Sequence, residues 1–357
     1  MAEEIVTIKA DGRTWTAVDH ITVGAHFRHA ARSFFFRIAA EIGPTATAWV
    51  FKAGTEIEIY FNADLVVRGF VDRYQPRIAG KRRADVSISG RSRAQDFIDS
   101  SAVHPTGEFK NKTVAEIAQA LDKFNVGIIT DQTLPKIPIC RITPGESNHA
   151  VVEKLARQAG VWPSGQADGS INLTIAGAGR NAPLIEGHNV LEADADHNWA
   201  GRHSHVIVRG QRAVGHGASS LEVEETARDP SLRRYRPVVV VRDDDTDKSR
   251  AKKAAHHRRD CEVGNSLKAH VTTQGFRDDK GALWTPGFLT FSDIPFLDIT
   301  QDMAIDAVVF TQSRSSGSRT RLTLVDPRAL GGKGNKGGKA GKAWSNGAGV
   351  SYAPDDI

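Results

Sequence analysis

Cysteine is scarce in this sequence, and long apolar runs are missing. The two cysteines among 357 residues, Cys140 and Cys261, lie far apart and form no pairing pattern. A disulfide framework and a cysteine-rich zinc site are therefore not predicted. No run of about 18 apolar residues occurs, and the acidic start, Met1-Ala2-Glu3-Glu4, lacks the basic and then apolar order of a signal peptide. We expect synthesis in a reducing cytoplasm, with no export by that route and no membrane insertion by this chain.

The excess of basic over acidic residues is also small. The chain has 47 basic and 42 acidic residues, a net charge of +5 and a pI near 9.2, which is only a weak indication of a nucleic-acid partner. Charged residues at 25% and hydrophobic residues at 40% are ordinary for a folded chain. The length predicts two or three domains.

Sequence signatures of catalysis are absent. The chain has no Gly-x-Ser-x-Gly elbow, no phosphate-binding P-loop and no dinucleotide-binding fingerprint between a predicted strand and a predicted helix. Carboxylates that could pair for glycoside hydrolysis cluster at Glu222, Glu224 and Glu225 and at Asp243 to Asp245. Arginines stand beside both clusters, which favours ion-paired or solvated faces. We expect no catalytic residue and no cofactor.

Histidine is more plentiful, with 13 copies, and raises the question of a metal. His203 and His205 would share one face of a strand, whereas His256 and His257 are neighbours on a predicted helix and point about 100° apart. Zinc-binding helices place their histidines four residues apart instead. We interpret all four as surface or interface residues and predict no metal ligand.

The first hundred residues have the two-residue period of strands. Asp11-Gly12 marks a hairpin, and the segment 54–61 alternates Ile57 and Ile59 with glutamates. About six short strands without a long helix predict a small antiparallel barrel or sandwich.

The character then changes to mixed α and β. Thr113 and Glu116 have the spacing of a capping box, which predicts a helix from there, and a second helix should follow Ser147 and end at Gly160. A hairpin around Asp168-Gly169 completes a small α/β module.

The remainder returns to β-structure, with one long helix over Asp247 to Cys261. Its last part loosely repeats the end of the first: Gly54, 67–71 and 86–91 parallel Gly287, 305–310 and 322–328. This parallel predicts two copies of one β-domain.

The last segment, 331–357, is rich in glycine and lysine and is predicted to be a flexible tail. Trp344 and Tyr352 within it are candidates for an anchor on a partner protein, although a solvent-exposed tail is the favoured interpretation.

The segment from Gly90 to Ala102 joins the first strands to the module. Val86 and Ile88 alternate in a strand, Gly90 gives the chain freedom to turn, and Ala94, Phe97 and Ile98 have helical spacing. We single out Gly90, Arg91, Asp96 and Asp99 as a hydrogen-bonded structural junction.

This strand, Gly-Arg-Ser-Arg turn and Ala-Gln-Asp-Phe-Ile-Asp-Ser-Ser-Ala segment resembles the baseplate hub proteins of Mu-like contractile-tail phages. Ser92 stands where that family often has Asp, and Phe97-Ile98 where it has Leu-Val. The helix, Gly-Glu-Ser, helix, Trp, turn and strand order of the module is similar as well. A more distant resemblance is to the hub part of type VI secretion spike proteins.

The resemblance implies a mainly β fold with two similar antiparallel β-barrel domains and a small α/β module. We expect a first barrel over 1–103, the module over 104–182, a second barrel with the long helix over 183–330 and the tail over 331–357. The implied function is structural, as a homotrimeric symmetry adaptor between a six-fold tail tube and a trimeric membrane-piercing spike. Implied partners are the tube protein, the spike and other baseplate proteins, and the implied location is the virion tail.

Two other classes of function remain open from the sequence. A tail-associated cell-wall hydrolase would need close carboxylates or a metal-bound water. A nucleic-acid-binding module would use the basic segment Lys248 to Arg259, but no aromatic residues interleave with its charges.

Overall fold

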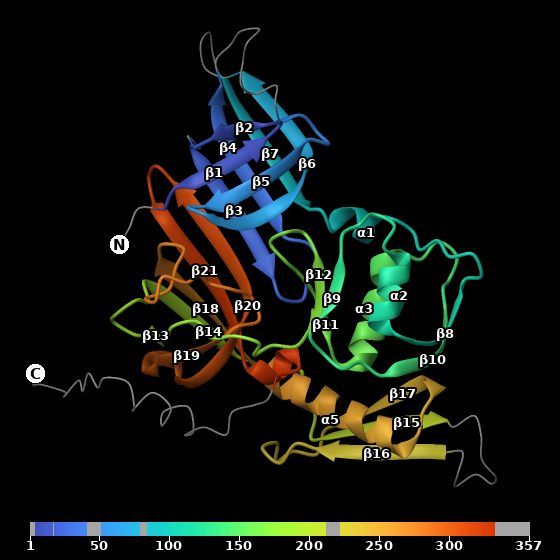
Figure 1. Ribbon diagram of the computed structural model, residues 1–357. Coiled ribbons are helices and arrows are strands. Elements are labelled where there is room, and N and C mark those ends of the chain that lie inside the picture. The colour runs from blue at the N-terminus through green and yellow to red at the C-terminus, as the bar shows by residue number, and fades with distance from the viewer. Residues whose placement is uncertain (1–3, 17, 41–50, 79–83, 212–221, 333–357) are drawn as a thin grey trace, which may run out of the picture.

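A computed structural model describes residues 4–16, 18–40, 51–78, 84–211 and 222–332. The mainly β class predicted from the sequence is confirmed (Figure 1). The first part consists of β1 (Val6–Ala10), β2 (Arg13–Trp15), β3 (His20–His26), β4 (Ser33–Ala40), β5 (Glu56–Phe61), β6 (Asp64–Ile78) and β7 (Ala84–Ser92). The last part contributes β13 (Leu184–Ile185), β14 (Glu192–His197), β18 (Leu267–Gln274), β19 (Leu289–Ile294), β20 (Ile299–Ser313) and β21 (Gly317–Val325).

These strands form one 13-stranded sheet with the order β14-β18-β21-β20-β3-β4-β7-β6-β5-β1-β2, and off this path β19 pairs with β20 and β13 pairs with β19. The two parts meet where β20 pairs with β3. Neither part closes into a ring of strands within the described residues, so two separate barrels are not confirmed. Because the pairing crosses from one part to the other, the sheet is continuous.

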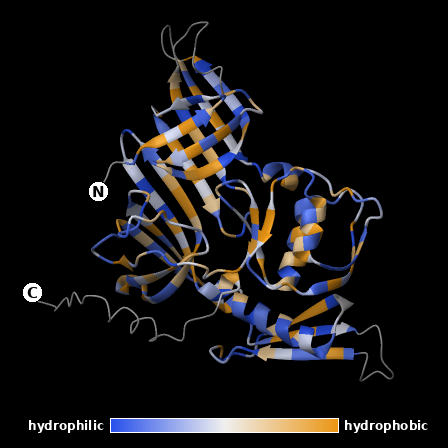
Figure 2. Cartoon of the chain, in the orientation of Figure 1, coloured by the Kyte–Doolittle hydropathy of each residue, from blue (hydrophilic) through white to orange (hydrophobic). Residues whose placement is uncertain are grey.

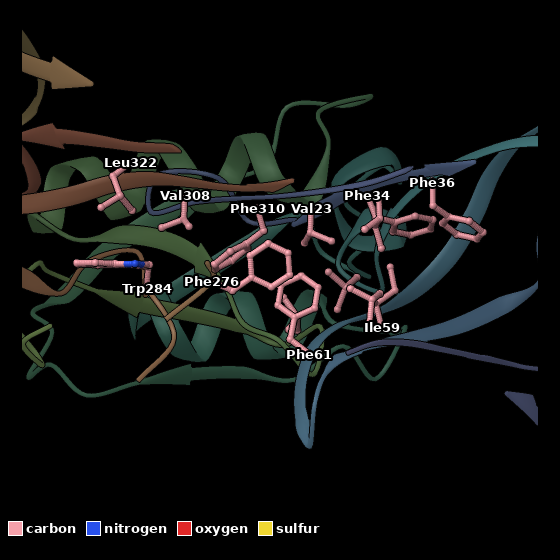
Figure 3. Packing of buried hydrophobic residues seen from close by; sticks show 14 of the residues in the cluster. Val23, Phe34, Phe36, Ile59, Phe61, Phe276, Trp284, Val308, Phe310 and Leu322 are labelled. Carbon is pink, nitrogen blue, oxygen red and sulfur yellow. The ribbon is translucent and has the colours of Figure 1, made fainter. Parts of the chain in front are cut away.

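The core of this sheet is also shared between the two parts. Figure 3 shows Phe61 of β5 against Phe276 and Phe310, whose ring centroids lie 4.3 and 5.2 Å away. All three rings are at most 3% exposed. Burial of this much aromatic surface across the boundary couples the stabilities of the two parts.

An α/β module follows β7 and begins before residue 104, its predicted start. It contains α1 (Gln95–Asp99), β8 (Glu108–Thr113), α2 (Val114–Leu121), β9 (Ile128–Thr130), β10 (Lys136–Arg141), α3 (Asn148–Ala159), β11 (Trp162–Gly165) and β12 (Ile171–Thr174). The capping box of Thr113 and Glu116 is present, and α3 ends at Gly160, as predicted. The apolar faces of α2 and α3 pack into one core with strands β9 and β12 (Figure 2).

Arg32 ties this module to the first part of the sheet. Its guanidinium donates to the carbonyls of Gly165 on β11 and Val66 on β6. Burial lowers the pKa of Arg32 to about 10.

A separate small sheet contains two strands that the sequence had placed in the second barrel. The segments predicted as strands of the second barrel, β15 (His205–Gln211) and β17 (Pro237–Asp245), instead form a separate sheet with β16 (Glu222–Arg228). The predicted long helix, α5 (Lys248–Gly264), covers this sheet (Figure 1). The reason is a local core, since Val206 and Val208 pack with Ala251 and Ala255 of the helix.

Short 3-10 turns, η2 (Pro295–Leu297) and η3 (Pro327–Leu330), complete the described fold. No helix among the described residues is long and apolar enough to cross a membrane.

Candidate functional site

The large sheet contains a repeat, as the sequence predicted, although the strand pairs align 67–71 and 86–91 with segments a few residues earlier than predicted. Strands β5, β6 and β7 have 6, 15 and 9 residues, and β19, β20 and β21 have the same three lengths. Each trio is an antiparallel meander. We call the two copies the first half-sheet (β3 to β7) and the second half-sheet (β14 and β18 to β21).

Backbone hydrogen bonds at the start of each meander are also equivalent. Gly54 donates to the carbonyl of Val71, and Gly287 donates to that of Ile305, at 2.8 and 2.7 Å. Both glycines have positive φ, 87° and 84°, which side chains disfavour. Gly54 and Gly287, which the sequence analysis paired, therefore adopt the same backbone conformation at equivalent places.

Rows of paired residues run across each half-sheet in the same way. In the first, Val23, Phe34, Gly90 and Val71 are successive partners on β3, β4, β7 and β6. In the second, the corresponding row is Ala195, Ala269, Leu324 and Ile305 on β14, β18, β21 and β20. Strand β14 is thus the equivalent of β3, and β20 is the equivalent of β6.

Each long strand carries a bulge with an aspartate at the same place. The register shifts between Val71 and Arg73 in β6 and between Ile305 and Ala307 in β20, so Asp72 and Asp306 are the extra residues. The predicted junction meets the first of them. Arg91 Nε lies 2.8 Å from Asp72 Oδ2, and Arg91 Nη2 lies 2.8 Å from Asp99 Oδ2.

The junction residues are brought together only in part. Arg91 and Asp99 pair, and their hydrogen bond lowers the pKa of Asp99 below its ordinary value. Gly90 packs so closely that a Cβ there would lie 2.1 Å from the carbonyl oxygen of Phe70. Asp96 lies in α1 with an exposed side chain and takes no part in the Arg91 contacts.

Asp72 was missed by sequence reasoning. It lies 19 residues before Arg91, and only the strand pairing of β6 with β7 brings the two together. The bulge itself was a possible signal, because a charged residue interrupts the alternation of β6 just after Val71.

The other aspartate joins the half-sheets. Arg28, in the turn after β3, places Nε 3.0 Å from Asp306 Oδ1. Asp306 is 8% exposed. The contact therefore lies at the β20–β3 join, where a partly buried ion pair fixes the approach of the two strands.

Three histidines of the metal hypothesis contact other side chains. His203 contacts Glu262 at 3.0 Å, whereas His205 contacts Ser204 and stacks edge-on with Tyr235. His257 lies near Cys261, and burial lowers its pKa. Across the described ranges, no group of three or more His, Cys, Asp or Glu side chains is arranged to hold a metal ion.

The carboxylates considered for hydrolysis also have ordinary surroundings. Glu224 pairs with Arg209 at 2.7 Å on an exposed face of β16. The side chains of Asp243 to Asp245, like Trp344 and Tyr352, lie outside the described residues. The basic helix α5 is ion-paired in its second half, where Arg258 contacts Glu262 and Arg259 contacts Asp260.

Comparison with known proteins agrees with the resemblance inferred from the sequence. Residues 5–92 match the family model of the N-terminal domain of Mu phage baseplate assembly protein GpP-like proteins. Residues 94–175 match the model of the second domain of baseplate hub protein gp44-like proteins. Baseplate hub protein gp44 of Escherichia phage Mu is 23% identical over 332 residues, which cover 89% of this chain and 87% of gp44.

Solved structures share the fold. The 43 kDa tail protein of prophage MuSo2 from Shewanella oneidensis has a TM-score of 0.82 at 23% identity, with 92% of this chain and 100% of that chain covered. A component of the E. coli type VI secretion system has a TM-score of 0.59 at 10% identity, with 92% and 79% covered. The resemblance to baseplate hub and tail proteins of Mu-like phages, and the more distant one to type VI secretion proteins, are confirmed.

Proposed function

We propose that this chain, similar to Mu-like baseplate hub proteins over most of its length, is the homotrimeric hub of a contractile tail baseplate. In this role it is a structural symmetry adaptor between a six-fold tail tube and a trimeric spike. Its partners are further copies of itself, the tube protein, the spike and other baseplate proteins. It is made in the host cytoplasm and resides in the virion tail.

The observation that carries this proposal is the repeated half-sheet. Each chain presents two similar half-sheets joined edge to edge through β20 and β3. Three chains joined in the same way present six, which matches the symmetry of a six-fold tube. A head-to-tail contact of this kind closes into a ring of three when successive copies are rotated by a third of a turn, and it covers strand edges that would otherwise be exposed.

The remaining parts suit accessory roles in such an assembly. We keep the division into 1–103, 104–182, 183–330 and 331–357 as part of the proposal, with the module and the α5 sheet on the outside of the ring. A cell-wall hydrolase is the alternative, and the ion-paired state of Glu224 and of the acids around α5 speaks against it. Specific nucleic-acid binding has no further support, because Arg258 and Arg259 of α5 already have acidic partners.

Electron microscopy of the purified full-length protein tests the ring directly. Class averages should show closed rings with three-fold symmetry, and the rings should cap tubes assembled from the tail tube protein. Images of single subunits only, with no capping of tubes, would refute the proposal. A parallel assay of peptidoglycan clearing should give no activity above buffer, and clearing would favour the hydrolase.

A further inference from the structure

We infer that the outer edge of β14 in one copy pairs with the second half of β6 in the next copy, antiparallel, with Asp194 opposite Arg77. This inference rests on the proposed ring and adds to it the two strands, their register and the contacts that select them. The partner is a second copy of this chain.

The choice of strands comes from the repeat. Within one chain, the second half of β20 pairs with β3. Strand β6 is the equivalent of β20, and β14 is the equivalent of β3, by the rows of partners described above. The same contact made between copies therefore joins β6 of one chain to β14 of another.

The register follows from a second row. Ile21, Phe36, Ile88 and Tyr74 are successive partners in the first half-sheet, and Ala193, Val271, Leu322 and Val308 are their equivalents in the second. Within the chain, Thr311 lies opposite Thr22. Thr311 lies three residues after Val308, so its equivalent in β6 lies three residues after Tyr74 and is Arg77. Thr22 lies one residue after Ile21, so its equivalent in β14 lies one residue after Ala193 and is Asp194.

Both edges are available in the single chain. Strand β14 is the last strand of the sheet order, and residues 73–78 of β6 have β7 as a partner on one side only among the described strands. Figure 1 places β6 and β14 in different regions of the molecule, so one chain cannot join its own two edges. Unpaired strand edges of this length are pairing surfaces by default.

The apolar side chains on these edges lie on the core side of the sheet. Ala193, Ala195 and Tyr74 already pack against the shared core. Ile78 is 74% exposed, which is unusual for a large aliphatic residue at the end of such a row. In the inferred register Ile78 lies opposite Ala193, so the neighbouring β14 would extend the apolar face over it.

The polar faces of the two edges are opposite in charge. Strand β14 carries Glu192, Asp194 and Asp196, and β6 carries Arg73 and Arg77, all of them exposed. Opposite charges directly across a strand pair stabilise the pairing, and like charges oppose it. The join within the chain has threonines at the corresponding place, so the charges would operate at the join between copies.

Pro76 restricts which strands this edge can accept. It has no backbone N–H, so any ladder formed with β6 has fewer donors than the equivalent ladder on β20, where Phe310 occupies the position. Proline on a strand edge discourages indiscriminate pairing. Selection then rests on the opposite charges of Arg77 and Asp194.

Disulfide trapping tests the register in the full-length chain. Residues directly opposite in an antiparallel pair have Cα atoms about 4.5–5.5 Å apart, which suits a disulfide. The double variant Arg77→Cys with Asp194→Cys should form covalent multimers on oxidation, seen on a denaturing gel without reductant. The matched control, Gln75→Cys with Asp194→Cys, is offset by two residues and should form few, as should each single variant beside the native Cys140 and Cys261.

A charge exchange gives a second readout that needs no cysteine. Arg77→Asp or Asp194→Arg alone should weaken self-association about tenfold, and the two together should restore it. A trimer by mass that shows neither the specific cross-link nor the rescue would overturn the register while leaving the proposed hub intact. A chain that stays monomeric would instead refute the hub, so the two failures are distinguishable.

Discussion

Asp72 and Asp306 occupy the same position in the two half-sheets, each as the extra residue of a bulge in a 15-residue strand. Their arginine partners differ in origin. Arg91 reaches Asp72 from the neighbouring strand, whereas Arg28 reaches Asp306 from the turn after β3, across the join. The same bulge aspartate therefore has two roles. In the first half-sheet its arginine partner anchors the α/β module, and in the second its arginine partner holds the two half-sheets together.

Removal of the Arg91 side chain should weaken the junction in a pH-dependent way. The pKa of Asp99 is lowered from its ordinary value of 3.8 by its hydrogen bond to Arg91. A lowered pKa contributes stability above about pH 4 that is lost as pH falls through the folded-state value. Because both side chains are more than a third exposed, we expect Arg91→Ala to cost only about 1 kcal/mol at pH 7.

Urea unfolding at several pH values measures this effect. The difference between Arg91→Ala and the parent chain should shrink steadily below pH 4. Arg93→Ala is the matched control, since Arg93 donates to the Asn125 carbonyl and its cost should not vary with pH. A pH-independent cost of Arg91→Ala would contradict the assignment of Asp99 as its partner.

A methyl group at Gly90 should be poorly tolerated. A Cβ there would lie 2.1 Å from the Phe70 carbonyl oxygen and 2.5 Å from the Phe34 ring. We expect Gly90→Ala to destabilise the protein by about 3 kcal/mol, because the backbone of β6 and the core ring must both shift. Gly201→Ala, which meets open space, should change stability by less than about 0.5 kcal/mol, and equal effects in thermal melts would be inconsistent with the structure.

The shared core predicts that the two half-sheets unfold together. Phe276 contacts Phe61 of the first half-sheet and Phe310 of the second. Truncation to alanine should cost about 3–5 kcal/mol and should lower the melting temperature of both half-sheets in one transition. Phe296→Ala, at a residue 88% exposed, is the control and should be nearly neutral. A second, separate transition in Phe276→Ala would show that the half-sheets are independent.

The tail should contribute to spike attachment and not to the ring. A chain that ends at Leu330 should keep the oligomeric mass of the full chain and capture less of the spike protein in a pull-down. Trp344→Ala and Tyr352→Ala in the full chain should reproduce part of that loss if these residues are the anchor. Unchanged spike capture by the shortened chain would show that the tail does not contribute to spike attachment.

Local features of the fold could be predicted from the sequence, and long-range ones could not. The Thr113 capping box, the end of α3 at Gly160 and the strand alternation before Gly90 depend on residues a few positions apart, and all three are present. The parallel between Gly54 and Gly287 was also readable, because both need the same backbone conformation.

Pairings between segments far apart in the chain could not be predicted from the sequence. Nothing near Val238 and Val240 indicates that they pack under α5 and not in the large sheet. The Arg91–Asp72 contact depends on a bulge, and the β20–β3 join depends on a strand pairing nearly 300 residues apart in the chain. Apolar alternation specifies that a strand has one buried face, but not which strand lies beside it.

Light scattering of the purified protein over a concentration series tests the central claim most directly. The subunit mass is 38.7 kDa, and the account predicts a stable species of three times that mass. Arg77→Asp should shift this species toward the monomer at concentrations where the parent chain remains assembled. A parent chain that scatters as a monomer at every concentration would contradict the ring.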